Sequence, residues 1–190
     1  MEDLLEFIQT VTDISQHSWE LLCSIIETVQ FKKGDYLAQE DKVCQSLFYI
    51  SQGYCRAFSI QDGIEVNTSF YFENEIATSM NSYVFGTKSS IAIQACEPLI
   101  TYRFEKAKVF EISKAAPEIE LIAKRNLQLI AARQEKQIQL YRLLKATQRY
   151  EYLEKNEPEI LQRVSLSQLA SYLGVKRETL SRIRNKRLRK

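Results

Sequence analysis

The sequence predicts an α+β protein in three parts: an N-terminal antiparallel β-roll or jelly-roll barrel with flanking helices, a long helix, and a C-terminal helix-turn-helix domain. Residues 31 to 104 are short runs of aromatic and β-branched residues separated by glycine- or proline-containing turns. After its first residue, the stretch 117–146 holds neither glycine nor proline. Residues 164 to 184 have the spacing of two short helices joined by a tight turn. We therefore expect domains at 1–116, 117–146 and 147–190.

Two helices are expected before the barrel. Residues 2 to 9 and 15 to 29 are predicted to be helical, with Ser15 or Ser18 as the cap of the second helix. Apolar residues recur at helical spacing on one side of that second helix: Trp19, Leu22, Ile25, Ile26 and Val29. The barrel strands are expected in the apolar runs that follow: residues 47–50, 66–72, 91–95 and 99–104.

A short helix over residues 105 to 114 is predicted to lead into the long helix. The long helix begins at Pro117, because proline is favoured in the first helical turn, and it spans roughly 45 Å. One apolar line recurs in sevens and is interrupted by Lys136: Ile122, Leu129 and Leu143. A second line points elsewhere: Leu127, Ile130, Gln134, Ile138 and Tyr141. A helix of this length is hard to cover with one chain, so we expect a homodimer through 117–146. The alternative is a helix buried within a monomer.

The two short helices near the end of the chain fit a helix-turn-helix. Ser167 is placed to cap the first helix, and Gly174 ends it, since glycine readily adopts the left-handed conformation that follows a helix. The second helix is predicted from about Arg177. Inward-facing apolar residues have the spacing of the motif: Leu169, Ala170, Leu173, Leu180 and Ile183. In this motif the second helix enters the major groove of DNA.

Positive charge is concentrated at the C-terminal end. Residues 1 to 146 carry 15 basic and 19 acidic side chains, a net of −4, whereas residues 147 to 190 carry 11 and 5, a net of +6. Residues 174 to 190 alone hold eight cations against one acid, Glu178. This asymmetry favours a polyanion as partner. The alternative is a solvated basic helix end, which the helix dipole favours.

The cysteine and histidine content excludes several kinds of chemistry. The four cysteines lie 21, 11 and 41 residues apart, without a Cys-x-x-Cys pair, and His17 is the single histidine. We therefore expect reduced thiols, no metal and no cofactor. A single histidine excludes most catalytic pairs of a nucleophile and a histidine base. An enzyme built on a cupin-like barrel would need a set of histidine and carboxylate metal ligands, so we do not expect an enzyme. No run of about 18 apolar residues exists and residues 1 to 15 are acidic, so we expect no membrane association and a cytoplasmic protein.

The order of barrel, long helix and helix-turn-helix resembles the Crp/Fnr family of bacterial transcription regulators, in particular the degenerate type common in Bacteroidetes. The resemblance covers nearly the whole chain. The motifs that carry it are Lys33-Gly34-Asp35, Tyr49-Ile-Ser-Gln-Gly53, Asp62-Gly-Ile-Glu65 and, most specifically, Lys176-Arg-Glu-Thr-Leu-Ser-Arg182. It implies a cyclic-nucleotide-binding-like sensory barrel. As partners it implies a second copy of the chain, double-stranded DNA with an inverted-repeat operator, RNA polymerase and a small-molecule effector.

The resemblance also assigns DNA contacts. Arg177, Glu178 and Arg182 should read bases, because arginine can fork onto guanine and glutamate can accept from the cytosine amino group. The neighbouring polar and basic side chains should contact the phosphates of the DNA backbone. The complete set of expected DNA contacts is Ser167, Lys176, Arg177, Glu178, Thr179, Ser181, Arg182, Lys186 and Arg187. The given sequence ends at Lys190, before the β-hairpin wing usual in the family, so we expect phosphate binding to depend on residues 184–190.

The barrel departs from the family's cyclic-AMP pattern. Members that bind this nucleotide have Gly-Glu followed by Arg-Ser, whereas this chain has Asn74-Glu75 and then Ser89-Ser90. The missing arginine removes a charge-assisted contact to phosphate worth about a few kcal/mol, and Lys88 replaces it only in part. We therefore do not expect control by cyclic AMP, and the effector is not identified. The candidate effector pocket is Glu75, Lys88, Ser89, Ser90 and Gln134.

These observations favour a homodimeric, sequence-specific DNA-binding transcription regulator whose barrel senses an unidentified effector. The alternative is a small-molecule-binding barrel module with a vestigial DNA-binding domain, which would bind its ligand but show no sequence preference on DNA.

Overall fold

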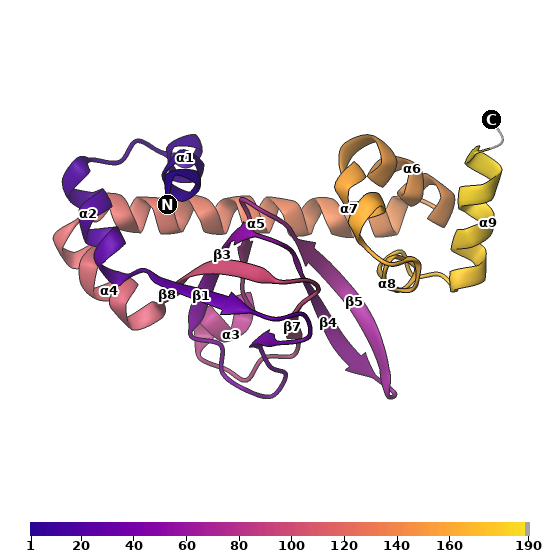
Figure 1. Cartoon of the computed structure of the whole chain (residues 1–190), viewed down its shortest axis with the longest axis horizontal. Coiled ribbons are helices and arrows are strands. Elements are labelled where there is room, and N and C mark those ends of the chain that lie inside the picture. The colour runs from indigo at the N-terminus through magenta and orange to yellow at the C-terminus, as the bar shows by residue number, and fades with distance from the viewer. Residues whose placement is uncertain (189–190) are drawn as a thin grey trace.

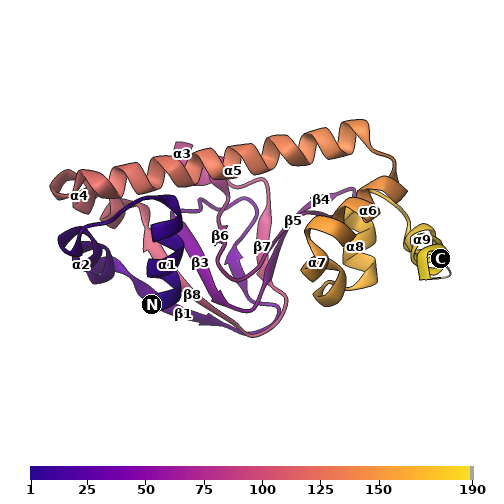
Figure 2. The same ribbon diagram turned by 90° about the horizontal axis from the view of Figure 1, so that it is seen from above.

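The computed structural model, which describes residues 1–188, confirms the predicted α+β class. In both views α5 runs along the molecule, with the sheets against its middle and α6 to α9 at one end (Figures 1 and 2). The helices are α1 (Glu2–Val11), α2 (Gln16–Ile25), α3 (Met80–Phe85), α4 (Lys106–Ala115), α5 (Pro117–Leu143), α6 (Ala146–Asn156), α7 (Pro158–Arg163), α8 (Leu166–Tyr172) and α9 (Arg177–Leu188). The strands are β1 (Glu27–Phe31), β2 (Tyr36–Ala38), β3 (Ser46–Gln52), β4 (Cys55–Gln61), β5 (Ile64–Tyr71), β6 (Ile76–Ala77), β7 (Ala92–Ala95) and β8 (Leu99–Glu105).

Two four-stranded antiparallel sheets face each other, in the orders β1-β8-β3-β6 and β2-β7-β4-β5. Their inward side chains form one core, in which Ile50, Cys55 and Ile93 are fully buried. Gly53 joins β3 to β4 at a φ of +86°, and a Cβ there would lie 2.4 Å from the carbonyl oxygen of Pro98. Glycine is therefore required at this turn for both its conformation and its size.

The second helix is shorter than the sequence pattern indicates. α2 ends at Ile25, and Val29, expected on its inward face, lies in β1 opposite Thr101 of β8. The prediction of a helix through residue 29 is therefore wrong. Thr28 and Val29 are β-branched and favour a strand, and β8 supplies a hydrogen-bonding partner along the chain. The cap of α2 is Ser15, one of the two predicted serines, and it accepts a hydrogen bond from the backbone N–H of Ser18.

The long helix begins at Pro117 as predicted and ends at Leu143, where Leu144 becomes extended. The apolar residues that recur every seven positions along this helix lie in two different environments. Ile122 is 8% exposed and packs with Leu4, Ile8 and Tyr102 of the same chain, whereas Leu129 and Leu143 are 56% and 77% exposed. Ile122 therefore belongs to the monomer core, because the N-terminal helices cover the first turns of α5. Among the described residues, no helix is long and apolar enough to cross a membrane.

The last two helices of the described chain form the predicted helix-turn-helix. α8 ends at Tyr172 with Leu173 as its C-cap, Gly174 follows at a φ of +66°, and α9 begins at Arg177. The predicted cap is displaced by two residues: the hydroxyl of Ser165, not that of Ser167, accepts the hydrogen bond from the backbone of Gln168. Gln168 lies three residues after Ser165, which is the spacing of a capping box, whereas Ala170 occupies that place after Ser167. Leu180 is fully buried and holds α9 against α8.

Candidate nucleic-acid interface and ligand cavity

One side of α9 faces solvent and carries the side chains predicted to contact DNA. Leu180 and Ile183 occupy the opposite side, within the core formed with α6, α7 and α8. Of the predicted DNA contacts, only Ser181 and Arg187 are half-buried. The exposed ones are Ser167, Lys176, Arg177, Glu178, Thr179, Arg182 and Lys186. Two further basic residues of the predicted phosphate-binding tail, Arg189 and Lys190, lie outside the described residues. The exposed set suits a polyanion, with two arginines and one glutamate available to base edges.

Arg187 forms ion pairs within the protein. Its Nη1 lies 2.6 Å from a carboxylate oxygen of Glu151, and its Nη2 lies 2.5 Å from one of Glu154, both on α6. These hydrogen bonds raise the pKa of Arg187, with the bond to Glu154 as the largest cause. Arg187 therefore ties the recognition helix to α6, whereas Lys186 beside it is exposed.

The C-terminal helices are docked on the barrel through a second arginine, which the sequence analysis did not identify. Arg163 at the end of α7 donates to Glu73 with a 2.6 Å contact and also pairs with Glu97 and Glu159. Its guanidinium stands over the rings of Tyr54 and Phe72, at 5.1 and 5.2 Å from their centres. The hydroxyl of Tyr54 donates to the Arg163 carbonyl at 3.0 Å. We call this group the Arg163 cluster.

The carboxylates around Arg163 favour the charged form of its guanidinium. The hydrogen bond to Glu73 is the largest cause that raises the pKa of Arg163. Burial alone would raise the pKa of Glu73, but the hydrogen bonds from Arg163 and the backbone N–H of Gly53 outweigh it and leave that pKa below its ordinary value. No local pattern could have revealed this pairing, because Arg163 and Glu73 are 90 residues apart in the chain.

The docking has a direct consequence for pH dependence. Because the pKa of Glu73 is lowered from 4.5, its contribution to stability is complete above pH 4.5 and is lost as the pH falls through the lower, folded value. We expect the free energy of unfolding in urea to fall below pH 4.5, and the Glu73→Gln variant to lose part of that dependence. An identical pH dependence in the variant would contradict this role for Glu73.

A second contact fixes α8 directly on β5. The backbone N–H of Asn67 donates to the hydroxyl of Ser171 at 3.0 Å, and this hydroxyl lies 3.2 Å from the carbonyl oxygen of Glu65. The ring of Tyr172 packs edge-on against Phe70 and Tyr141. The first helix of the helix-turn-helix is therefore held by a barrel strand and by the end of α5.

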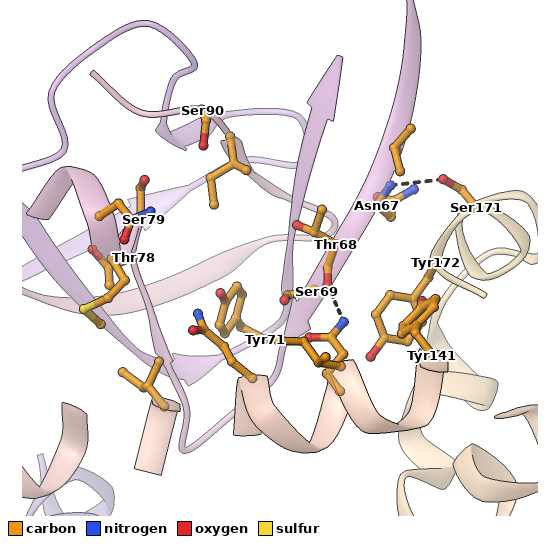
Figure 3. Close-up of a pocket in the computed structure, with 18 of the residues that line it drawn as sticks. Asn67, Thr68, Ser69, Tyr71, Thr78, Ser79, Ser90, Tyr141, Ser171 and Tyr172 are labelled. Carbon is orange, nitrogen blue, oxygen red and sulfur yellow. Dashed lines mark hydrogen bonds between the residues drawn. The ribbon is translucent and has the colours of Figure 1, made fainter. Parts of the chain in front are cut away.

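Beside this contact lies a cavity of about 760 Å³, which we call the polar cavity. It extends between β5, the segment 76–81, the loop before β7, α5 and α8, and Figure 3 shows it with Ser90 and Ser79 at one end and Tyr141 and Tyr172 at the other. Hydroxyl and amide side chains dominate the labelled lining (Figure 3). Arg142 is the single ionised side chain among its described lining residues. Aliphatic side chains complete the lining, among them Val66, Ile91 and Ile138, so the cavity suits an uncharged ligand that has apolar surface and also forms hydrogen bonds.

The structure brings two of the five predicted pocket residues to this cavity, Ser90 and Gln134. The other three lie elsewhere. Glu75 pairs with Arg133 at 2.5 Å, and burial raises its pKa despite that partner. Ser89 is buried, with its hydroxyl 2.7 Å from that of Ser79, and Lys88 is exposed on the surface.

Sequence reasoning missed most of the cavity. Thr78, Ser79, Tyr141, Ser171 and Tyr172 line it, yet they come from separate segments with no shared motif. Among the described residues, no group of three or more His, Cys, Asp or Glu side chains is placed to hold a metal ion.

Comparison with protein-family models finds no match, and comparison with curated protein sequences finds none either. Solved structures do match. The c-di-GMP-responsive global regulator CLP of Xanthomonas campestris is 15% identical, with a TM-score of 0.71 over 90% of this chain and 91% of CLP. A variant of CooA from Carboxydothermus hydrogenoformans is 16% identical, with a TM-score of 0.70 over 91% of this chain and 80% of CooA. The catabolite activator protein of Thermus thermophilus is 18% identical, with a TM-score of 0.58 over 91% and 83%.

These matches span nearly the whole chain and define its fold class. The protein has the fold of the Crp/Fnr-type transcription regulators. The resemblance noted in the sequence is therefore confirmed at the level of structure.

Proposed function

We propose that this protein is a homodimeric, sequence-specific DNA-binding transcription regulator that acts in the cytoplasm. The observation that carries the proposal is the face of α9, where exposed Arg177, Glu178 and Arg182 stand on a helix-turn-helix held by a buried core. Phosphate binding alone needs only positive charge, whereas this face combines two forked donors with an acceptor, as base recognition requires. The Crp-type fold supports DNA binding and dimerisation in general.

Selection from a random pool of DNA duplexes tests this function. Two protomers related by a two-fold axis should place their recognition helices in major grooves about 34 Å apart. The selected sequences should therefore be inverted repeats with half-sites one helical turn apart. Recovery of unrelated sequences would favour the alternative of a ligand-binding barrel with a vestigial DNA-binding domain.

The polar cavity is the effector site in this proposal. Barrel residues such as Ser79 and Ser90 line one end, and Ser171 and Tyr172 of the helix-turn-helix line the other. A ligand that spans the cavity contacts both domains, so it can stabilise one arrangement of them by differential contacts. Among the described lining residues Arg142 alone is ionised, which supports an effector other than cyclic AMP, whose phosphate would lie without a close counter-charge at the barrel end.

The dimer face is proposed on the flank of α5 that carries Leu127 and Ile138. They are 42% and 54% exposed and eleven residues apart, which is close to three full turns, with the small Ala131 between them. Leu129 and Leu143 define the other exposed flank, which Lys136 interrupts. An uncharged stripe with a small central residue lets two helices approach closely.

We expect the double variant Leu127→Glu, Ile138→Glu to raise the dimer dissociation constant at least about 30-fold, because apolar burial worth about 2 kcal/mol is removed. Sedimentation equilibrium measures this directly. The matched control, Leu129→Glu with Leu143→Glu, should remain dimeric. Dissociation of the control instead would assign the interface to the other flank.

A further inference from the structure

A second cavity lies next to the polar one and is lined by far fewer polar groups. It measures about 100 Å³ and lies between α1, α4, α5 and the β1-β8-β3-β6 sheet. Its walls are almost wholly aliphatic or aromatic, with Leu4, Phe104 and Ile119 among them. Asn126 and Tyr83 are the polar side chains of its described lining, and the Nδ2 of Asn126 donates to the carbonyl of Ile122 at 3.0 Å. We call this space the apolar cavity.

The two cavities share a wall. Ile76, Met80 and Ile130 line both of them. Ile76 comes from β6, Met80 from the first turn of α3 and Ile130 from the middle of α5. Methionine is unbranched and has three rotatable bonds, so its side chain can change rotamer without moving the backbone. This wall can therefore open by side-chain rotation at Met80.

The chemistry on the two sides of the wall is complementary within one molecule. Next to it on the polar side, Ser79 and Gln134 offer a hydroxyl and an amide group, while the hydroxyl of Thr78 donates to the carbonyl of Ser46 at 2.9 Å. On the apolar side most of the wall offers a polar atom no hydrogen-bond partner, which costs free energy, whereas an alkyl group gains from leaving water. One ligand with a neutral polar end and an apolar end satisfies both sides.

We propose that the effector is an uncharged amphipathic small molecule, with a hydrogen-bonding head in the polar cavity and a short alkyl tail that passes Met80 into the apolar cavity. This rests on the proposed function of the polar cavity as effector site. The tail should be roughly four carbons long, since benzene with its six carbons fits an engineered apolar cavity of about 150 Å³.

The chain offers an internal reporter for this proposal, because Met80 is one of only two methionines and Met1 is the other. The test titrates methyl-¹³C-methionine-labelled protein with 1-alkanols from ethanol to 1-hexanol and follows both methyl signals by NMR. We expect the Met80 signal to move saturably while that of Met1 stays in place. Affinity should rise about fourfold for each added methylene, which corresponds to about 0.8 kcal/mol, and level off after roughly four carbons.

Two controls separate the tail compartment from general solvent effects. Ala123→Leu, which fills the apolar cavity, should abolish the dependence on chain length, whereas Ala132→Leu on the exposed side of α5 should leave it unchanged. On the unmodified protein, hexane-1,6-diol should bind at least about fivefold more weakly than 1-hexanol, because its second hydroxyl leaves water for a cavity with mainly apolar walls.

The proposal is overturned by unsaturable shifts of both methyl signals, by equal binding of the diol and the alcohol, or by an unchanged dependence on chain length in Ala123→Leu. The titration contains no DNA. A negative titration therefore does not contradict sequence-specific DNA binding. A negative duplex selection likewise does not contradict the binding of the amphipathic ligand.

Discussion

Replacing Arg163 by methionine is expected to lower the free energy of unfolding by about 2–3 kcal/mol and to release the helix-turn-helix from the barrel. Arg163 neutralises Glu73, Glu97 and Glu159, which would otherwise face one another uncompensated. Removing one partner of a fully buried ion pair costs about 3–5 kcal/mol, and the partial exposure of this cluster reduces that value. Urea unfolding gives the stability, and hydrogen exchange in α7 and α8 reports the release.

The matched control is Lys155→Met on α6, which removes a charge from an exposed position of the same group of helices. It should change the stability by no more than about 0.5 kcal/mol, as expected for a surface substitution. Equal unfolding of the two variants would show that the Arg163 cluster does not hold the helices on the barrel.

The largest expected effect on DNA binding is at Arg177 and Arg182. Replacing either residue by alanine should cost roughly 1–3 kcal/mol per half-site on the selected duplex and relax the preference at one base pair. Lys186→Ala should instead weaken binding to all sequences alike and reduce the log–log salt slope by about 0.9 for each phosphate that the protein no longer neutralises. Competition titrations on duplexes with single base changes measure the first effect, and titrations at several salt concentrations measure the second.

Arg187 provides a contrast within the same turn. Because Arg187 pairs with Glu151 and Glu154, its replacement should loosen α9 from α6 and reduce thermal stability. Lys186→Ala should leave the thermal stability unchanged. A pure decrease of salt-dependent affinity in Arg187→Ala, with unchanged stability, would restore the phosphate role that the sequence suggested.

The parts of the fold that local patterns determine could be predicted from the sequence. Pro117 and the stretch without glycine that follows it mark the long helix, and Gly174 marks the turn between the last two helices. At Val29 the local pattern failed, because helical spacing and strand propensity overlap there and pairing with β8 decided the outcome. The serine cap is a different case, because Gln168 three residues after Ser165 is a local capping-box signal that Ser167 lacks.

Features that depend on distant contacts could not be predicted in this way. Periodicity placed Ile122 on an apolar line of α5 but could not show that the N-terminal helices cover it. The Arg163 cluster joins the start of β4, the β5–β6 turn and α7, and the wall at Met80 joins β6, α3 and α5. Of the residues that the family resemblance placed in the candidate pocket, Ser90 and Gln134 line the polar cavity, whereas neighbouring Ser89 points into the protein interior.

The most direct test of the central claim is a binding titration of the unmodified protein on the selected inverted repeat and on a scrambled duplex of equal length and composition. Both titrations are run at the same series of salt concentrations. A sequence-specific regulator should bind the repeat at least about 1,000-fold more tightly than the scrambled duplex at physiological salt. Equal affinity for the two duplexes at every salt concentration would contradict this account and would make α9 a phosphate-binding element without sequence preference.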